Sequence, residues 1–259
     1  MPSFKLPEDS NYNQLDGEDL FIAVKKSAFN EFNPKVLGLG DIKIASVARP
    51  AIAALFDLQG QMGFDLFAKD VPMYLNGFLN WIFAAIKKET ILKEYSDGVS
   101  VYHDLPFFTK FMGDGLLVLW DTTSMSSTNQ HNLIQSCKNI LDAYETQFLP
   151  TMRRKVTDVP ALLRCGIAKG TVLSVGNGED YVGSCINVAA RLQKLSGLQI
   201  AFARRGFDPE EAWKDLKNIK FWLLKQVSVR GIGQKELVYV LKKDFEALTT
   251  EEQKLFENP

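Results

Sequence analysis

Hydrophobic residues along the chain fall into one long periodic stretch and several short runs, and the two patterns predict different elements. Apolar positions recur every three or four residues between residues 70 and 92, which predicts a long amphipathic helix with an aromatic-rich buried face. Short apolar runs at 51–56, 107–108 and 116–120 predict strands. The polar segment Gly113-Asp114-Gly115 separates the last two runs, so we expect a hairpin that holds a carboxylate at its turn.

The second half of the chain alternates shorter patterns of both kinds. We expect helices at 131–148, 184–195, 209–216 and 243–259, and strands at 161–170, 172–175, 198–203, 221–229 and 236–242. Polar or glycine-rich stretches between them predict loops at 95–105, 124–130 and 177–183, and a glycine turn between the strands at 161–170 and 172–175. Because hairpins recur between the helices, the pattern predicts an α+β fold with a mostly antiparallel sheet flanked by helices.

Composition excludes several classes of protein. The 259 residues are 46% hydrophobic, enough for a substantial core, and 30 Lys and Arg balance 31 Asp and Glu. This balance gives no global field that would gather nucleic acid or an anionic membrane. No apolar stretch approaches the roughly twenty residues that cross a bilayer, and no signal peptide is recognisable near residue 1. The three widely spaced cysteines, Cys137, Cys165 and Cys185, indicate buried thiols in a reduced, cytoplasmic protein.

Candidate chemistry begins with two carboxylates at predicted strand ends. Asp57 ends the apolar run 51–56, and Asp114 lies in the hairpin turn. On neighbouring strands these carboxylates would form a site for hard divalent cations. Gly60 lies three residues after Asp57, in a turn whose backbone N–H groups would suit phosphate oxygens.

Histidine chemistry has little support, because the chain has only His103 and His131 and neither has a carboxylate at ligand spacing. Asn187 and Arg191 lie four residues apart, on one face of the predicted helix at 184–195. Taken alone, this pair also fits an ordinary solvated helix face. Gly38-Leu39-Gly40 is not a dinucleotide-binding fingerprint, because Lys43 occupies the position of its third glycine.

Four segments together resemble a known family in their order and spacing. They are Asp57 with Gly60, Lys110-Phe111-Met112-Gly113-Asp114, Arg164-Cys165-Gly166-Ile167-Ala168-Lys169-Gly170, and Asp180 followed by Asn187 and Arg191. This set resembles the catalytic domain of class III nucleotidyl cyclases, which implies a ferredoxin-like fold over residues 47–243, with an N-terminal extension at 1–46 and a tail at 244–259. The segments 78–83, 107–115 and 174–183 are most similar to the bacterial pyrimidine cyclases of Pycsar antiphage defence.

The resemblance implies a reaction and a role for each matching residue. The family closes the ribose 3′-hydroxyl onto the α-phosphate of a nucleoside triphosphate and releases pyrophosphate, here converting UTP to cyclic UMP as a second messenger in antiphage defence. Two Mn²⁺ or Mg²⁺ ions would be held by Asp57, Asp114 and the backbone carbonyl of Leu58. Arg191 would stabilise phosphate charge, Asn187 would position the ribose, and Arg230 would bind the triphosphate. The family builds each site from two chains, so the resemblance implies a head-to-tail homodimer with two shared sites.

The identity of the base depends on two positions that read adenine in adenylate cyclases, Lys110 and Asp180. A lysine donor and a carboxylate acceptor suit adenine, cytosine and uracil, so hydrogen-bond polarity leaves CTP and ATP open as alternatives to UTP. A bulky side chain such as Phe56 or Phe111 would fill the space that a small pyrimidine leaves, although burial in the core is the commoner role of any single Phe.

One departure from the family pattern supports a different class of function. Gln61 and Met62 follow Gly60, where relatives carry Phe or Ser and then Thr or Ser. If the site needs that hydroxyl, the chain would be a catalytically degenerate nucleotide-binding or scaffold domain. A polymerase-like palm enzyme also binds metal ions through two carboxylates. It needs a positively charged surface for nucleic acid, however, and the balanced charge argues against one.

Overall fold

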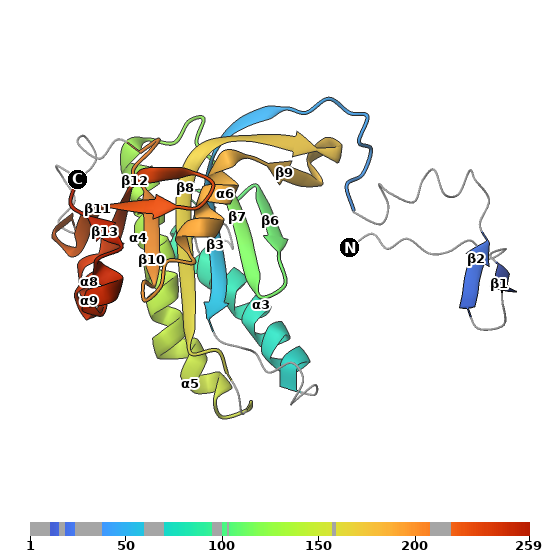
Figure 1. Ribbon diagram of the computed structural model, residues 1–259, viewed down its shortest axis with the longest axis horizontal. Helices are drawn as coiled ribbons and strands as arrows, with labels where there is room; N and C mark the ends of the chain where they lie inside the picture. The colour runs from blue at the N-terminus through green and yellow to red at the C-terminus, as the bar shows by residue number, and fades with distance from the viewer. Residues whose placement is uncertain are drawn as a thin grey trace. The chain divides into compact units, whose positions relative to one another are not determined.

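The computed structural model describes residues 11–15, 19–23, 38–59, 70–94, 100–102, 104–156, 159–207 and 219–259. The chain divides into two compact units, which are treated separately below (Figure 1). The arm unit comprises Met1–Arg49 and Val172–Val182, and the main unit comprises Pro50–Thr171 and Gly183–Pro259. The predicted helix at 209–216 and the glycine turn at Gly60 lie outside the described residues.

In the described part of the chain, nine strands form the principal sheet. Their order is β13-β11-β12-β10-β8-β3-β7-β6, and β9 pairs with β8 off this path. The strands are β3 (Ala48–Gln59), β6 (Phe108–Phe111), β7 (Gly115–Asp121), β8 (Leu162–Val175), β9 (Asp180–Val182), β10 (Ile200–Ala203), β11 (Trp222–Val229), β12 (Gly233–Leu241) and β13 (Phe256–Glu257). The pairing of β10 with β8 is parallel, whereas β3–β7, β6–β7, β8–β9, β10–β12, β11–β12 and β11–β13 are antiparallel. The sheet is therefore mostly antiparallel, as the sequence predicts.

The remaining elements cover the sheet or connect its strands. The helices are α3 (Asp70–Thr90), α4 (Ser127–Ala143), α5 (Leu149–Met152), α6 (Ser184–Leu192), α8 (Lys242–Ala247) and α9 (Thr250–Gln253), and a π-helical turn, Tyr144–Phe148, joins α4 to α5. Two small hairpins, β1 (Asn11–Leu15) with β2 (Asp19–Ala23) and β4 (Ile91–Glu94) with β5 (Ser100–Tyr102), lie outside the principal sheet. Every helix within the described ranges is too short or too polar to cross a bilayer.

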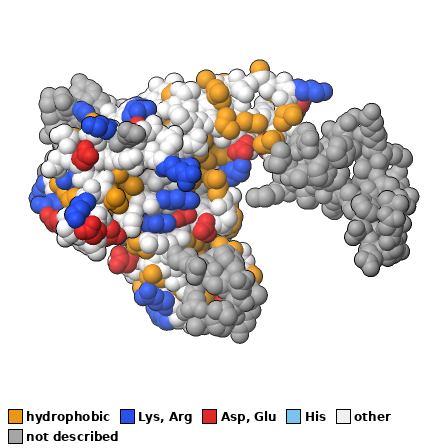
Figure 2. Space-filling view, in the orientation of Figure 1, with side chains coloured by type: hydrophobic (Ala, Val, Ile, Leu, Met, Phe, Trp, Pro, Cys, Tyr) orange, Lys and Arg blue, Asp and Glu red, His pale blue; other side chains and the backbone are white. Residues whose placement is uncertain are grey.

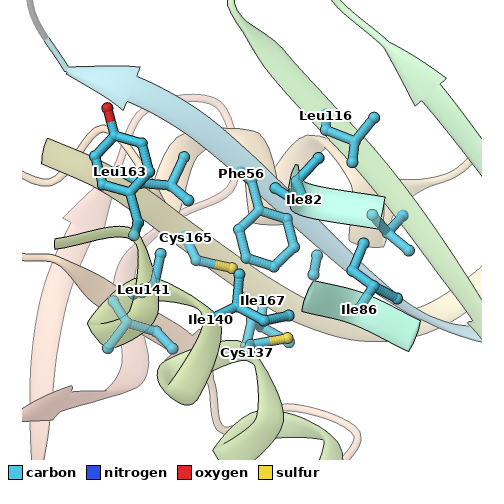
Figure 3. Close-up of a cluster of buried hydrophobic side chains, with 14 of the residues drawn as sticks. Phe56, Ile82, Ile86, Leu116, Cys137, Ile140, Leu141, Leu163, Cys165 and Ile167 are labelled. Atoms are coloured by element: carbon cyan, nitrogen blue, oxygen red, sulfur yellow. The ribbon is translucent and has the colours of Figure 1, made fainter. Parts of the chain in front are cut away.

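One face of the sheet is sealed by α3 and α4. Phe56 and Leu116 from the sheet meet Ile82 and Ile86 of α3 and Ile140 of α4 in a continuous apolar core (Figure 3). The Cys137 and Cys165 thiols lie in the same cluster, and all three cysteines are buried and free, as predicted.

The aromatic face of α3 belongs to this core. Tyr74, Phe78 and Trp81 pack against Tyr144 and Phe148 of the π-helical turn, with ring centroids 4.9–6.4 Å apart. The buried Tyr74 and Tyr144 hydroxyls are 2.9 Å apart, and Tyr144 Oη donates to the Pro160 carbonyl oxygen at 2.6 Å. Both polar groups are therefore satisfied inside the core.

The opposite face of the main-unit sheet carries α6. Leu163, Cys165 and Ile167 of β8 point into the α3–α4 core, so the intervening positions point the other way. A Cβ built on Gly166 would lie 2.0 Å from the Ala189 carbonyl oxygen of α6. Only glycine allows the helix to approach this strand so closely.

In the arm unit, residues 38–47 run beside the end of β8. Val47 donates its backbone N–H to Ser174 Oγ at 2.9 Å, and its carbonyl accepts from the Ser174 N–H at 3.0 Å. Exposed aliphatic side chains gather on this unit: Ile42, Ile44, Val47, Leu173 and Val182 (Figure 2). Leu173 and Val182 are direct partners in the β8–β9 register, so they share one face.

Two predictions for residues 161–183 are wrong. A single strand of 14 residues, β8, replaces two short strands around a glycine turn. Gly170 serves close packing instead, because a Cβ there would lie 3.1 Å from Cys185 Cβ. The predicted loop at 177–183 contains β9, and the turn lies at Gly176–Gly178, where all three residues have positive φ.

Element boundaries differ in three other places. Helix α4 begins at Ser127, inside the predicted loop at 124–130, because Ser126 Oγ accepts from the Asn129 N–H. The predicted loop at 95–105 contains the strand β5, which pairs with β4. The predicted C-terminal helix is two short helices and a strand, because Thr249 and Glu252 form a capping box that starts a new helix.

Candidate active site

The β3–β7 pairing brings the two predicted metal-binding carboxylates together. Asp57 lies directly opposite Gly115, the first residue of β7, and Asp114 immediately precedes it. The Leu58 N–H donates to the Asp114 carbonyl oxygen at 3.3 Å, which fixes the hairpin turn beside the end of β3. Asp57 is half-buried and Asp114 is exposed, so one carboxylate faces the protein and the other faces solvent.

Asp57 has an ion-pair partner. Arg164 of β8 donates from Nη2 to Asp57 Oδ2 at 2.7 Å, and each side chain is only 14% exposed. Arg164 Nε is buried and has no hydrogen-bond partner among the described residues.

The sequence alone assigns no role to Arg164, which belongs to the segment 164–170. The sequence nevertheless indicates which way its side chain points. A charged residue between Leu163 and Cys165, both of which belong to the core, has to point to the other face of the strand. That face is the one that carries Asp57.

Two further residues of β3 are placed clearly. Leu58 is buried in the core by its side chain, which leaves only its backbone carbonyl for a ligand role. Phe56 is fully buried in the same cluster (Figure 3). Because successive residues of a strand point to opposite faces, Asp57 lies on the other side of β3. This placement favours the core alternative for Phe56 over a contact with the base. Gly60 lies outside the described residues, as do Gln61 and Met62.

Lys110 lies on the same face of the sheet as Asp57. It pairs with Leu117 of β7, and Leu117 pairs in turn with Leu55 of β3, two residues from Asp57. Cross-strand partners share a face, and so do alternate residues of one strand. Lys110 is half-buried there.

Helix α6 presents the predicted polar pair to solvent. Asn187 and Arg191 are exposed, whereas Ala189 and Leu192 are buried against the sheet. Asn187 lines a cavity of about 230 Å³ together with Gly231 and Ile232 of the β11–β12 turn. Arg230 is exposed in that turn, so the structure brings Asn187 and the Arg230 turn to one patch.

The same cavity contains a neutral thiol and an ion pair. Burial raises the pKa of the Cys185 thiol, which keeps it protonated at neutral pH. Arg205 donates to Glu236 Oε1 at 2.6 Å.

Asp180 belongs to the arm unit, as the first residue of β9. It is half-buried, and its Oδ1 accepts the Tyr181 N–H at 2.9 Å.

The donor set at Asp57 and Asp114 fits a divalent cation. Two carboxylates and the Leu58 carbonyl are hard oxygen donors of the kind that Mg²⁺ and Mn²⁺ prefer. Among the described residues, no group of three or more His, Cys, Asp or Glu side chains is placed to hold a metal ion. The site accordingly offers a partial ligand set, which a phosphate ligand or water would complete.

Comparison with solved structures identifies the fold. The guanylyl cyclase Cya2 superposes with a TM-score of 0.55 at 17% identity, over 76% of this chain and 94% of that one. The catalytic core of a rhodopsin-guanylyl cyclase with converted specificity, in complex with ATPαS, gives a TM-score of 0.49 at 16% identity, over 75% and 97%. The guanylate cyclase domain of RhGC from Catenaria anguillulae, in complex with GTP, gives 0.48 at 15% identity, over 76% and 98%.

The likeness to Cya2 confirms the predicted fold class. The chain has the class III cyclase fold, an α+β arrangement with a mostly antiparallel sheet flanked by helices. No protein-family model matches the chain, and no curated protein matches it in sequence.

Proposed function

We propose that the chain is a nucleotidyl cyclase that converts a nucleoside triphosphate to its 3′,5′-cyclic monophosphate and pyrophosphate. The observation that carries this proposal is the carboxylate pair Asp57 and Asp114 at adjoining strand ends of a class III cyclase fold. A palm-type polymerase has a similar pair, but the balanced charge of this chain offers no nucleic-acid track.

In this proposal Asp57, Asp114 and the Leu58 carbonyl hold two Mn²⁺ or Mg²⁺ ions. Such ions lower the pKa of a bound ribose hydroxyl and neutralise the leaving pyrophosphate. The protein then needs no histidine base, in keeping with the burial of His131, whose Nδ1 lies 2.7 Å from the Ser127 carbonyl oxygen.

Three residues on the α6 side complete the proposed site. Arg191 stabilises charge on the phosphates, Asn187 orients the ribose, and Arg230 binds the far end of the triphosphate. Their shared exposure, and the cavity between Asn187 and the Arg230 turn, support these roles. A solvated helix face would also expose Asn187 and Arg191, but it would not require a cavity beside Asn187.

We further propose a head-to-tail homodimer with two equivalent sites, each combining the carboxylates of one chain with the Asn187–Arg191 pair of the other. The exposed aliphatic cluster of the arm unit supports association, because contiguous apolar surface on a soluble protein marks interaction sites. The enzyme would act in the cytoplasm, where its three free cysteines would stay reduced.

For the base, we propose a pyrimidine, with UTP preferred over CTP. The support is the resemblance of residues 78–83, 107–115 and 174–183 to bacterial pyrimidine cyclases of antiphage defence, where cyclic UMP acts as a second messenger. Lys110 and Asp180 would read the base edge, Gly60 would contact phosphate, and Phe56 would shape the pocket only indirectly, through the core behind β3.

The test is turnover of the purified full-length protein with UTP, CTP, ATP and GTP in parallel, in Mn²⁺, with products identified by mass spectrometry. We expect cyclic UMP as the main product. Cyclic AMP or cyclic GMP as the main product would refute the pyrimidine assignment. If the protein forms no cyclic nucleotide but still binds nucleotides and dimerises, the degenerate scaffold function is correct instead.

A further inference from the structure

The proposed function leaves the ion pair between Asp57 and Arg164 unexplained. The pair places a positive charge directly on a carboxylate that is proposed to bind a cation. Two positive charges cannot share one carboxylate at hydrogen-bond distance without repulsion. Arg164 contacts only Oδ2 of Asp57, so a divalent cation that binds through Oδ1 would be repelled by the guanidinium and would bind best when Arg164 moves away.

The release of Arg164 has a cost that depends on what else is bound. Both side chains are 14% exposed, so water only partly replaces the lost contact. Arg164 Nε is already buried without a hydrogen-bond partner among the described residues. A guanidinium released from Asp57 would therefore have at least two unsatisfied N–H donors in a poorly hydrated position.

We propose that Arg164 is a positioning residue that closes the cation site at Asp57 until an anion arrives with the cation. This inference rests on the proposed function, because it assumes that Asp57 is a metal ligand. A divalent cation alone gains Asp57 but leaves Arg164 unpaired. A cation that arrives with a phosphate-type anion gives Arg164 a new acceptor. The two ligands therefore bind cooperatively, and the site discriminates against free metal ions.

The consequence is a reciprocal coupling between metal and anion binding. Wild-type protein binds Mn²⁺ weakly when no anion is present and much more tightly when one is. Removing the Arg164 charge frees Asp57 for the metal ion and abolishes most of the enhancement by the anion.

Equilibrium dialysis of Mn²⁺ against full-length protein tests this coupling, with and without inorganic triphosphate as the anionic probe. We expect Arg164→Gln to bind Mn²⁺ about tenfold more tightly than wild type without triphosphate, the effect of one partly buried charge pair. Triphosphate should strengthen Mn²⁺ binding by about tenfold more in wild type than in Arg164→Gln. Dialysis equalises the free Mn²⁺–triphosphate complex across the membrane, so only protein-bound metal is counted.

Matched variants separate the possible outcomes. Lys138→Gln removes a charge pair with Asp142 on α4, outside the candidate site, and should leave Mn²⁺ binding unchanged. Asp57→Asn should weaken Mn²⁺ binding in every condition. If Asp57→Asn weakens binding but Arg164→Gln binds Mn²⁺ no more tightly than wild type, the gating role is refuted while the proposed function stands. If Asp57→Asn has no effect on Mn²⁺ binding either, both the gating role of Arg164 and the proposed metal site are refuted.

Folding of the variants is checked by thermal unfolding. If Arg164→Gln does not unfold cooperatively, Arg164→Lys replaces it. Lysine replaces the planar guanidinium with a compact, strongly hydrated ammonium that holds a carboxylate less specifically, so this variant should bind Mn²⁺ severalfold more tightly than wild type. Equal or weaker binding would refute the gating role.

Discussion

Two neighbouring residues of β3 have opposite roles, and they represent the two faces of the sheet. Phe56 is fully buried among side chains of α3, α4 and the neighbouring strands. Asp57, the next residue, points to the other face and meets Arg164. One face is thus a closed apolar core, whereas the other carries the Asp57–Arg164 ion pair. The alternation of one strand thus separates the residues that stabilise the core from those proposed to carry the chemistry, so substitutions on each face should produce different defects.

The largest expected effect is on catalysis. Asp114→Ala should lower kcat by about ten-thousandfold, because it removes a proposed metal ligand, while the free energy of unfolding changes little for an exposed turn residue. Steady-state cyclase assays and urea unfolding measure the two quantities. Asp121→Ala, at the other end of the same strand, is the control and should keep near-normal activity. Asp114→Ala activity within tenfold of wild type would contradict the metal role.

The next effect is on the core face. Phe78→Ala should lower the free energy of unfolding by about 3–5 kcal/mol, because Phe78 is fully buried in the aromatic cluster. Urea titration measures this loss, and kcat per folded molecule should stay close to wild type. Phe83, on the same helix but 45% exposed, provides the control, and Phe83→Ala should cost less than about 1 kcal/mol. Similar costs for the two variants would refute the assignment of the buried helix face.

Gly166→Ala tests whether the two faces are independent. The added Cβ would lie 2.0 Å from the Ala189 carbonyl oxygen, so α6 must move away from β8. We expect a loss of about 1–3 kcal/mol in stability together with reduced activity, because α6 carries Asn187 and Arg191. Urea unfolding and nucleotide turnover of one preparation measure both. Unchanged stability and turnover would mean that α6 tolerates a shift and that its position is not critical.

The smallest effect concerns the buried tyrosine hydroxyls and pH. Tyr144→Phe removes the 2.6 Å bond to Pro160 and the 2.9 Å contact with the Tyr74 hydroxyl, and should cost about 1–2 kcal/mol at neutral pH. Burial raises the pKa of Tyr144 to about 12, above the value near 10 expected in the unfolded chain. The folded state thus retains the proton longer, so this contribution to stability is complete below pH 10 and lost as pH rises to about 12. Unfolding experiments between pH 9 and 12 should show a shallower decline for Tyr144→Phe than for wild type, and equal declines would contradict the raised pKa.

The sequence predicts correctly those elements whose own hydrophobic pattern shows which side is buried. The periodic apolar face of α3 and the uninterrupted apolar run of β3 can be recognised without knowing which other elements pack against them. The single strand β8 could not be predicted, because Gly170 is explained only by the approach of Cys185 from α6. A glycine that makes room for another element has the same sequence signal as a glycine in a turn.

The candidate site was predictable to a similar extent. Alternation and hairpin chemistry indicated that Asp57 and Asp114 would meet, and the β3–β7 register brings them together. The pairing of Asp57 with Arg164 joins residues 107 positions apart, and no local pattern encodes it. The roles of Asn187, Arg191, Arg230, Lys110 and Asp180 depend on a bound nucleotide and a second chain, and they stay predictions.

Complementation between inactive chains tests the central claim most directly, namely that the carboxylates and the α6 residues act in one shared active site. Asp114→Ala and Arg191→Ala proteins, each inactive alone, are mixed in equal amounts under conditions that exchange subunits, and cyclic UMP formation is measured. Random pairing makes half of the dimers mixed, each with one intact site of two, so we predict recovery of about a quarter of wild-type activity. No recovery, with mixed dimers confirmed by native mass spectrometry, would contradict the shared site.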